Sequence, residues 1–375
     1  MTTLLWFRRD LRLTDNPAFN YAVESGAVLP VYIHYPEEEA PWQPGAASNW
    51  WLHHSLTALK NALAERGLPL LIQSGPSLET LQHLIEQTGA TQVVWNRLYE
   101  PAVIARDSVI KQTLAEQVTV KSFNANLLLE PWQIQNKQGR PFKVFTPYWK
   151  TCQNLLAQAP PTPSSVTTKP IAAKATQGLT IDELTLLPTL NWADDFSKYW
   201  QPGEEGAKDR LAHHLQHNLG DYKTDRDFPA LPATSKLSAH LHFGEIGPRQ
   251  IWATIEHLAP TNDENELVSR QHFLSEIAWR EFAHHLLYHF PETVTQPFNS
   301  KWQNFEWNMA QTGQAAKWLS AWKQGTTGTS LVDAGMQELW QTGWMHNRVR
   351  MLVGSLLTKN MGIHWQQGAR WFWDT

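Results

Sequence analysis

The strongest constraint on the fold is a regular alternation of short apolar strands and amphipathic helices over the first 130 residues. Between the strands, leucines recur at helical spacing from Ser48 to Arg66 and again from Ser77 to Thr88, and a glycine follows each segment. Strand–helix alternation with short links predicts a parallel, doubly wound sheet. The strands are expected at Thr3–Phe7, Val28–Ile33, Leu70–Ile72, Gln92–Trp95 and Val118–Val120.

The pattern changes further along the chain. Residues 157–190 are rich in Pro, Thr, Ser, Ala and Lys without periodicity, which indicates a connector that crosses the surface. From Gly203 onward only helical periodicity remains. We therefore expect an α/β domain at residues 1–130, a connector at 131–200 and an all-α domain at 201–375. Helices of the last part are expected at Lys208–Leu219, Leu267–Phe290, Ser330–Thr342 and Met345–Asn360.

Simple counts disfavour several classes of protein. Cys152 is the only cysteine, so we expect no intrachain disulfide and no cysteine-based zinc site. The apolar run Leu4–Phe7 stops at Arg8 and is too short for a signal peptide or a membrane span. A formal net charge of −4 leaves only a local basic patch for binding nucleic acid. We expect a soluble, cytoplasmic monomer without a membrane partner or a metal.

The first strand lacks the signature of a dinucleotide site. It runs into Arg8-Arg9-Asp10 rather than into a glycine-rich phosphate loop, so a nucleotide cofactor is expected elsewhere. Tryptophan is unusually frequent, because the chain has 20 and most of them follow residue 199. Its indole offers a broad stacking face for flat ligands, and a Trp-rich core is the alternative interpretation.

Two polar segments of the second half have both an ordinary and a functional interpretation. The segment Gly220–Pro229 is typical of a helix stop followed by a charged loop. The hydroxyl cluster Ala233–Ser238 is typical of a helix cap, but it could also present hydroxyls and backbone N–H groups to a phosphate. From the residues alone, capping is the better interpretation.

Two helical segments mix charged and apolar side chains. Glu276 and Arg280 lie four residues apart, as in a surface ion pair worth about 0.3–0.5 kcal/mol. Because their neighbours Phe273 and Phe282 are large and apolar, the two charges could instead line a polar pocket. The segment Trp344–Met351 combines Asn, two Arg and Met, a mixture that packing does not require.

Five motifs together resemble successive signatures of the photolyase/cryptochrome family, and they occur in family order along the whole chain. The segment Trp50–Leu56 is most similar to the class III photolyases, which stand close to plant cryptochromes. Any one motif is weak, whereas five in order are specific. They are Trp6–Leu13, Asp227–Pro229, Thr234–Ser238, Trp279–Phe282 and Trp344–Met351.

The resemblance implies an N-terminal α/β antenna domain and a C-terminal helical domain that holds a folded FAD. It implies that the hydroxyl segment contacts the flavin nucleotide, with its hydroxyls at the phosphates, and that aromatic and arginine side chains complete the site. The flavin-contacting positions are Tyr222, Thr234, Ser235, Lys236, Leu237, Ser238, Phe273, Arg280 and Arg350.

The same resemblance implies a DNA-binding pocket and an electron relay. Arg226 matches a contact to a DNA phosphate. Trp307 and Trp365 match the outer and middle members of a chain of tryptophans that carries electrons. A flipped-out pyrimidine dimer would be held in a pocket, where Glu276 hydrogen-bonds the lesion and steadies its radical anion. The pocket positions are Glu276, Trp279, Asn347 and Met351.

An antenna and an unfinished C-terminal end also follow from the resemblance. Class III members commonly hold a methenyltetrahydrofolate in the first domain, Glu100 matches an acidic contact to its pterin, and Trp50 is expected nearby. Val294 stands where some relatives have a lysine. Family members continue beyond the position of Thr375 with further flavin contacts and the inner relay tryptophan. We therefore expect the FAD-binding domain to be incomplete at its C-terminal end.

Three functions are compatible with these motifs. The first is light-driven repair of cyclobutane pyrimidine dimers in DNA by electron transfer from reduced FAD, the activity of a deoxyribodipyrimidine photolyase. His346-Asn347 favours this lesion, because relatives that repair the other major photoproduct tend to carry a histidine pair there. The alternatives are a cryptochrome-type blue-light photoreceptor without repair activity and an inactive truncated fragment.

Overall fold

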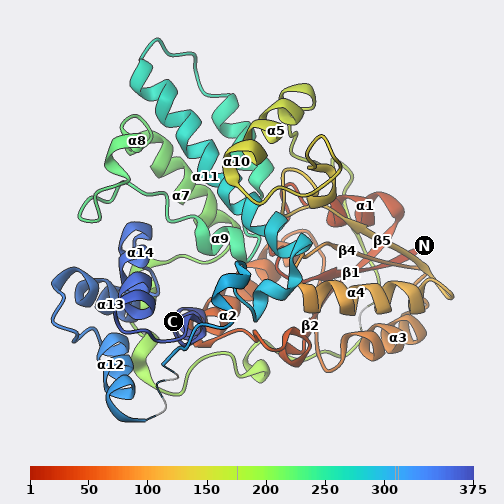
Figure 1. Cartoon of the computed structure of the whole chain (residues 1–375). Coiled ribbons are helices and arrows are strands. Elements are labelled where there is room, and N and C mark those ends of the chain that lie inside the picture. Colours follow the sequence, from red (N-terminus) through yellow and green to blue (C-terminus); the bar gives the residue numbers. More distant parts are fainter. Residues whose placement is uncertain (175, 309, 311) are drawn as a thin grey trace.

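The computed structural model describes residues 1–174, 176–308, 310 and 312–375. Its N-terminal part is a parallel sheet with helices on both faces (Figure 1). The strands lie in the order β3-β2-β1-β4-β5, so the chain winds outward from β1 in both directions, which confirms the predicted doubly wound sheet. These strands are β1 Thr2–Phe7, β2 Ala27–His34, β3 Leu71–Ser74, β4 Gln92–Asn96 and β5 Thr119–Phe123.

Four helices cover the two faces of the sheet: α1 Pro17–Ser25, α2 Ala46–Ala64, α3 Ser77–Thr88 and α4 Pro101–Leu114. Leu5 and Phe7 of β1 enter a core with α1 and α2. Leu4 and Trp6 point the other way, into a core with α3 and α4. Because successive side chains of a strand point to opposite faces, a sheet covered on both sides requires such uninterrupted apolar strands.

The ends of these helices follow signals in the sequence. The side-chain Oδ1 of Asn16 accepts a hydrogen bond from the backbone N–H of Phe19 at 3.0 Å, and Pro17 opens α1. Gly89 follows α3 with a φ of 63°, a left-handed conformation that glycine adopts without strain.

Residues 131–200 contain regular structure as well as the irregular stretch expected from the sequence. Helix α5 (Phe145–Gln158) packs Tyr148 into the core of the helical part. A short strand, β6 (Ile171–Ala172), then pairs with the start of β2, and α6 (Phe196–Tyr199) packs against α2. This segment is therefore attached to both parts of the molecule.

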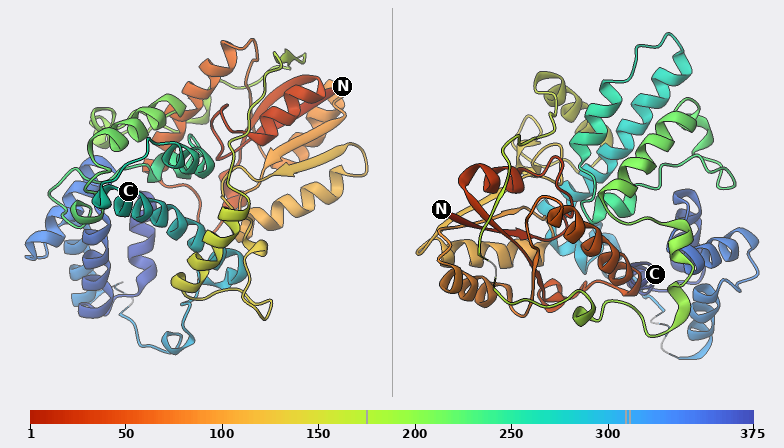
Figure 2. Two further views of the ribbon diagram at one scale, coloured as in Figure 1. Left: turned by 90° about the horizontal axis from the view of Figure 1, so that it is seen from above. Right: turned by 180° about the vertical axis from the view of Figure 1, so that it is seen from behind.

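The rest of the chain is helical, as predicted: α7 Glu204–His217, α8 Tyr222–Asp225, α9 Ser238–His242, α10 Pro248–Glu256, α11 Glu264–His289, α12 Gly313–Gln324, α13 Ser330–Thr342, α14 Asn347–Ser355 and α15 Trp365–Asp374. One apolar core surrounds α11 and another joins α12, α13 and α14. In Figure 2 the N-terminus lies at the outer end of the sheet, whereas the C-terminus lies among the helices.

One predicted helix is divided in the structure. The sequence predicts a single helix over Met345–Asn360, but α14 begins at Asn347 and passes into a π-helical turn at Leu356–Asn360. His346 caps α14, because its ring Nδ1 accepts a hydrogen bond from the backbone N–H of Arg348 at 3.1 Å. Turns of the π type occur often at functional sites.

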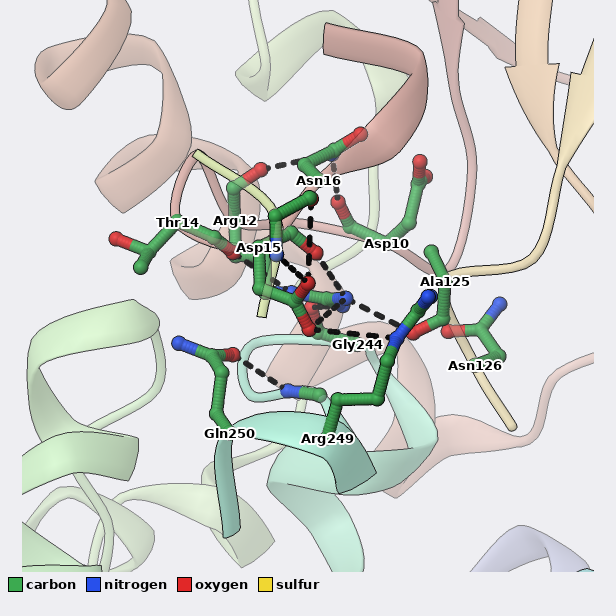
Figure 3. A network of polar contacts seen from close by, with 12 residues as sticks. Asp10, Arg12, Thr14, Asp15, Asn16, Ala125, Asn126, Gly244, Arg249 and Gln250 are labelled. Atoms are coloured by element: carbon green, nitrogen blue, oxygen red, sulfur yellow. Dashed lines mark hydrogen bonds and ion pairs between the residues drawn. The ribbon is translucent and has the colours of Figure 1, made fainter. Parts of the chain in front are cut away.

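A buried polar network centred on Arg12 joins the α/β part to the helical part (Figure 3). The fully buried guanidinium donates to the carbonyl oxygens of Gly244 at 2.9 Å and Ala125 at 2.8 Å. It also donates to the Asp15 carbonyl at 2.7 Å, and the Asp15 carboxylate lies 3.8 Å from both Arg12 and Arg249. Buried charges are tolerated when they are paired and hydrogen-bonded, so we call this set the junction network and expect it to fix the two parts together.

Gly244 shows how closely the two parts approach each other. Its φ is 66°, and a Cβ atom there would lie 2.3 Å from the carbonyl oxygen of Arg9 and 2.6 Å from the Cα of Asp10. Beside it, the backbone N–H of Leu11 donates to the Phe243 carbonyl at 3.0 Å. Only glycine combines this backbone conformation with this spacing.

The described residues include neither a membrane-spanning helix nor a cluster of metal-binding side chains. No helix in this part of the chain combines the length and the apolar character that a membrane crossing needs. No group of three or more His, Cys, Asp or Glu side chains within the same residues could hold a metal ion.

Candidate flavin and lesion site

A cavity of about 360 Å³, which we call the central cavity, lies between the sheet and the helices. Arg9 follows β1 and Leu98–Glu100 follow β4, so these lining residues come from the carboxyl ends of neighbouring strands. The strand order reverses between β1 and β4, which is where α/β sheets place ligand sites. The opposite wall comes from α9 and α11. Predicted site residues in the lining are Tyr222, Ser235, Leu237, Ser238, Phe273, Glu276 and Arg280.

The hydroxyl segment reaches this cavity through Ser235 and Ser238. Leu237, the N-cap residue of α9, offers no side-chain acceptor, and the Leu237 N–H donates to Ser235 Oγ at 3.4 Å. Ser235 therefore has a local backbone contact and also lines the cavity. Lys236 has a φ of 52° and its ammonium lies 4.3 Å from the centre of the Trp344 ring. Thr234 and Lys236 are not among the residues that line the cavity, although their sequence neighbour Ser235 is.

The surface ion pair between Glu276 and Arg280 is not formed. Arg280 donates instead to the Asn126 carbonyl at 2.7 Å and lines the cavity. Glu276 pairs with Arg226, whose side chain is 9% exposed. The two charges therefore line a polar pocket, as their apolar neighbours indicate.

Aromatic rings form the back of the cavity. The rings of Tyr222 and Phe273 lie 5.3 Å apart, and the buried His214 ring lies 4.6 Å from Phe273. Burial, with a smaller contribution from His213, lowers the pKa of His214 to about 4. These rings are therefore uncharged at neutral pH and offer aromatic faces to a flat ligand.

Arg9, which the sequence reasoning missed as a site residue, and Glu100, which it predicted as an antenna contact, form the sheet side of the central cavity. Arg9 Nη2 lies 2.7 Å from Glu100 Oε1. Burial alone would raise the pKa of Glu100, but Arg9 lowers it to about 2, so both groups are charged at neutral pH. Burial and the charge of Arg280 lower the pKa of His284 to about 4, and burial and Arg9 lower that of His242 to about 3.

The other predicted lesion contacts, Trp279, Asn347 and Met351, are exposed and are not among the residues that line the central cavity. We call the outer surface that they form with Arg226 the rim. Trp279 is 47% exposed and stacks on Phe145, with ring centres 3.7 Å apart and planes 8° apart. Asn347 is exposed at the start of α14, and Met351 is 58% exposed one turn later. Phe145 was not predicted, because it comes from α5, more than a hundred residues earlier in the chain.

Three ion pairs connect the rim to the cavity. Arg226 contacts Glu276 and lies 3.8 Å from the Asp227 carboxylate. Asp227 in turn binds Arg348 of α14, with an Nη2 to Oδ1 distance of 2.7 Å. The chain of charges thus runs from α11 through the end of α8 to α14.

The predicted relay tryptophans lie on one aromatic path. The Trp307 ring lies 5.5 Å from His364, and His364 lies 5.8 Å from Trp365. Arg350 lies elsewhere, with its guanidinium 4.6 Å from the centre of the Phe372 ring, and is not among the residues that line the central cavity.

A second cavity, of about 540 Å³, adjoins the central one through Arg9 and Glu100. Trp42, Val294 and Trp365 contribute to its largely apolar lining. Trp50, which was expected near Glu100, does not line this cavity. It packs instead against Phe196, at 5.3 Å, and His54, at 4.4 Å, because its position on α2 turns it into the core of the α/β part.

The donor set of the central cavity fits a flavin dinucleotide. Hydroxyls of Ser235 and Ser238 and the cations Arg9 and Arg280 suit a pyrophosphate, and the aromatic wall suits a flat ring. Arg9 Nε is buried without a hydrogen-bond partner among the described residues, so an anionic ligand atom could satisfy it. A further cavity of about 260 Å³ shares Ser238 and His242 and extends this space.

Comparisons with known proteins agree with this architecture of an α/β domain followed by a helical flavin-binding domain. Residues 3–165 match the family model of DNA photolyase, and residues 273–375 match that of the FAD binding domain of DNA photolyase. The chain therefore belongs to the DNA photolyase family, which confirms the resemblance seen in the sequence and the FAD-binding character of the helical part.

Individual relatives include both photo-lyases and cryptochromes. The chain is 44% identical to the deoxyribodipyrimidine photo-lyase of Agrobacterium fabrum, over 99% of this chain and 76% of that protein. It is 38% identical to cryptochrome-2 of Arabidopsis thaliana, over 100% of this chain and 62% of that protein.

Solved structures show the same likeness. The bacterial class III photolyase from Agrobacterium tumefaciens matches with a TM-score of 0.89 and 42% identity, over 100% of this chain and 76% of that one. The Synechocystis cryptochrome matches with a TM-score of 0.84 and 25% identity, over 99% of this chain and 78% of that one.

Proposed function

We propose that the chain repairs cyclobutane pyrimidine dimers in DNA in a light-driven reaction. One observation carries this proposal: Glu276 lines the central cavity and lies beside a rim with an exposed, stacked indole at Trp279. A carboxylate next to an aromatic platform suits a flipped pyrimidine, which needs a hydrogen-bond acceptor and a stacking surface. The high identity to photolyases supports the same conclusion.

Bound FAD supplies the light-excited electron for this chemistry. Tyr222, Ser235, Leu237, Ser238, Phe273 and Arg280 would hold it, and Arg9 would balance its negative charge. The protein's own task is to position the lesion. Because a damaged base pair costs less to unstack, extrusion into the pocket selects the dimer over intact DNA.

Each lesion contact has a separate role. Trp279, held flat by Phe145, would stack on the extruded dimer. Glu276 would accept a hydrogen bond from a ring N–H and hold it while negative charge develops on the dimer. Asn347 and Met351 would close the pocket from α14, with an amide for hydrogen bonding and a polarizable thioether for close packing.

The test is repair of a thymine-dimer oligonucleotide by the full chain, supplied with FAD under reducing conditions and blue light. We expect light-dependent loss of the dimer, and a strong loss of that activity in Glu276→Ala. The matched control is Glu266→Gln, which removes a glutamate of equal side-chain exposure, 29%, from the same helix. Dimers left intact by a chain that visibly binds flavin would reject the proposal.

A blue-light photoreceptor is the second candidate. The identity to cryptochrome-2 and the aromatic path from Trp307 to Trp365 support it. Such a protein would bind flavin and photoreduce it but leave dimers intact. The visible absorption spectrum of the purified chain distinguishes both candidates from a fragment that binds no flavin, the third function compatible with the sequence.

We also propose that the second cavity holds the antenna. Glu100 offers a carboxylate at its inner end, and Trp42 and Trp365 offer aromatic faces, a combination that suits the donor edge and flat ring of a methenyltetrahydrofolate pterin. Binding of the folate, measured by its absorption and lost in Glu100→Ala, would test this. The domain boundaries, the monomeric state and the cytoplasmic location remain predictions.

A further inference from the structure

Arg226 occupies an unusual position for a residue at the molecular surface. It directly follows the short helix α8, and the next residues, Asp227 and Phe228, are about half exposed, at 50% for the Asp227 side chain. The Arg226 side chain is only 9% exposed. Its guanidinium is therefore turned inward from a chain segment that itself faces solvent.

Two partners hold the guanidinium in this inward position. Its Nη1 contacts the Glu276 carboxylate, and its Cζ lies 5.4 Å from the centre of the Tyr222 ring. The segment is anchored to α11 behind it, because the Lys223 backbone N–H donates to Ser269 Oγ at 3.2 Å. The backbone of the segment is thus held against α11, whereas the Arg226 guanidinium is held only by side chains.

Other charged groups around this pair come from three elements, and Lys223 and His346 also lie near enough to interact with the set. His272 of α11 lies 3.9 Å from Glu276, Asp227 lies 3.8 Å from Arg226, and Arg348 of α14 binds Asp227. None of these groups replaces Arg226 as the close partner of Glu276. If Arg226 left, Glu276, which is 29% exposed, would lose its nearest cation.

We infer that Arg226 exchanges partners when a lesion enters the pocket, from the Glu276 carboxylate to a DNA phosphate. This inference rests on the proposed function. A flipped pyrimidine brings a ring N–H that can donate to Glu276 and replace the guanidinium. Arg226 then turns outward, where a phosphate satisfies its charge.

The exchange couples base recognition to a phosphate contact. Undamaged DNA offers Glu276 no donor, so taking Arg226 from Glu276 leaves a carboxylate without its partner, which carries a free-energy penalty. Arg226 therefore contacts the backbone only when the pocket is filled. It acts as a specificity-determining residue, because one of the protein's phosphate contacts becomes conditional on the lesion.

The salt dependence of DNA binding measures this coupling directly. Each phosphate contact to duplex DNA contributes about 0.9 to the slope of log K against log salt concentration. With the full chain and FAD, in the dark, we expect the slope for a dimer-containing duplex to exceed that for the undamaged duplex by about 0.9. Equal slopes in a chain that prefers the dimer would overturn the inference.

The substitution Glu276→Gln removes the carboxylate charge that pairs with Arg226, so the guanidinium is released even when no lesion is present. We expect the slope for undamaged DNA to rise to that of dimer DNA, and the affinity for undamaged DNA to rise about two- to fivefold, the size expected for losing one partly exposed ion pair. Glu266→Gln breaks a comparable pair with Arg270 on α11 and should leave the difference in slope unchanged. If Glu276→Gln also leaves the difference in slope between dimer DNA and undamaged DNA unchanged, Arg226 keeps its partner in the complex and the exchange does not occur.

Arg226→Gln provides a second test that does not depend on the pocket carboxylate. It should lower the slope for dimer DNA to that for undamaged DNA, and an unchanged slope would also overturn the inference. Circular dichroism and flavin content show that each variant is folded. A wild-type chain without any preference for dimer DNA would reject the proposed function itself, an outcome distinct from a preference with equal slopes.

Discussion

Two arginine-centred networks in this molecule include carboxylates, but they differ in what surrounds the arginine. In the junction network, Arg12 is fully buried and its hydrogen bonds go to backbone carbonyl oxygens. At the rim, Arg226 is paired with side chains, and its neighbours Asp227 and Arg348 are 50% and 44% exposed. A carbonyl can move only with the fold, whereas a side chain can rotate.

This difference separates a structural role from a binding role. The junction arginine is satisfied from several directions by chain segments far apart in the sequence, so it holds the fold in one arrangement. The rim arginine has few partners, each of which an incoming ligand can replace. Three substitutions and one change of pH test this contrast.

Arg12→Ala should have the largest effect, a loss of about 3–5 kcal/mol in the free energy of unfolding. It leaves the buried Asp15 carboxylate without one of its cations and removes the donor from several carbonyl oxygens. Urea denaturation measures the loss, and Lys111→Ala, on the exposed side of α4, is the control. A stable Arg12→Ala chain would show that the junction does not fix the two parts.

Mild acid should destabilise the cavity wall before the junction. The pKa values of His242, His284 and His214 in the folded chain are lowered by burial to about 3, 4 and 4. Because the unfolded chain takes up protons below about pH 6.5 and the folded chain does not, stability present above that pH is lost as the pH falls toward 4.

Each of the three rings should account for a loss of roughly 2 kcal/mol in stability between pH 7 and pH 5. Burial raises the pKa of Glu281 to about 7, which offsets one of the three, so the net loss is roughly 2–4 kcal/mol. The carbonyl partners of Arg12 do not titrate in this range. Urea midpoints at pH 7, 6 and 5 measure the effect, and His284→Asn should reduce the slope. A flat profile between pH 7 and 5 would mean that these rings are hydrated or protonated without penalty.

Phe145→Leu should weaken binding of dimer DNA by about 0.5–1.5 kcal/mol, the usual contribution of an aromatic pair. Leucine keeps the apolar bulk but does not provide the flat face that orients Trp279. A titration with dimer-containing DNA in the dark measures the change, and Phe145→Tyr should restore the affinity. If the Phe145→Leu variant binds dimer DNA as tightly as the unsubstituted chain does, Trp279 is oriented by its own helix alone.

Asp227→Asn should have the smallest effect, an increase of about 0.2–1 kcal/mol in the affinity for undamaged DNA. The carboxylate binds the exposed Arg348 and repels phosphates, so its loss favours DNA of any sequence. Filter binding of undamaged DNA at two salt concentrations measures the change in affinity between the variant and the unsubstituted chain. Weaker binding would instead show that Asp227 mainly orients Arg348 for DNA.

Much of the fold was predictable because local pattern and tertiary structure agree. Helices α3 and α13 have the bounds that periodicity and the following glycines predict, Ser77–Thr88 and Ser330–Thr342. The strand β6 was not predictable, because two exposed residues carry no pattern and its pairing with β2 is set by the distant packing of the segment. The π turn after α14 likewise depends on how that helix packs.

The site was predicted best where its residues are close in sequence. The hydroxyl segment and the α11 motif supplied part of the cavity lining, whereas Arg9, Asn126 and His242 come from separate elements that only the fold brings together. One signal was available for His284: it follows Glu276 and Arg280 at intervals of four, which places all three on one stripe of α11. The neighbouring Glu281 lies on a different face.

Helix α11 runs for 26 residues, or roughly 39 Å, and it serves three separate surfaces. One stripe lines the central cavity, Trp279 stacks on α5, and the Glu281 carboxylate accepts a hydrogen bond from the Leu128 N–H at 2.8 Å. The angles between these surfaces are set by helical geometry alone. Each can therefore diversify by point substitution without realigning the others, whereas a single inserted residue would misorient all three.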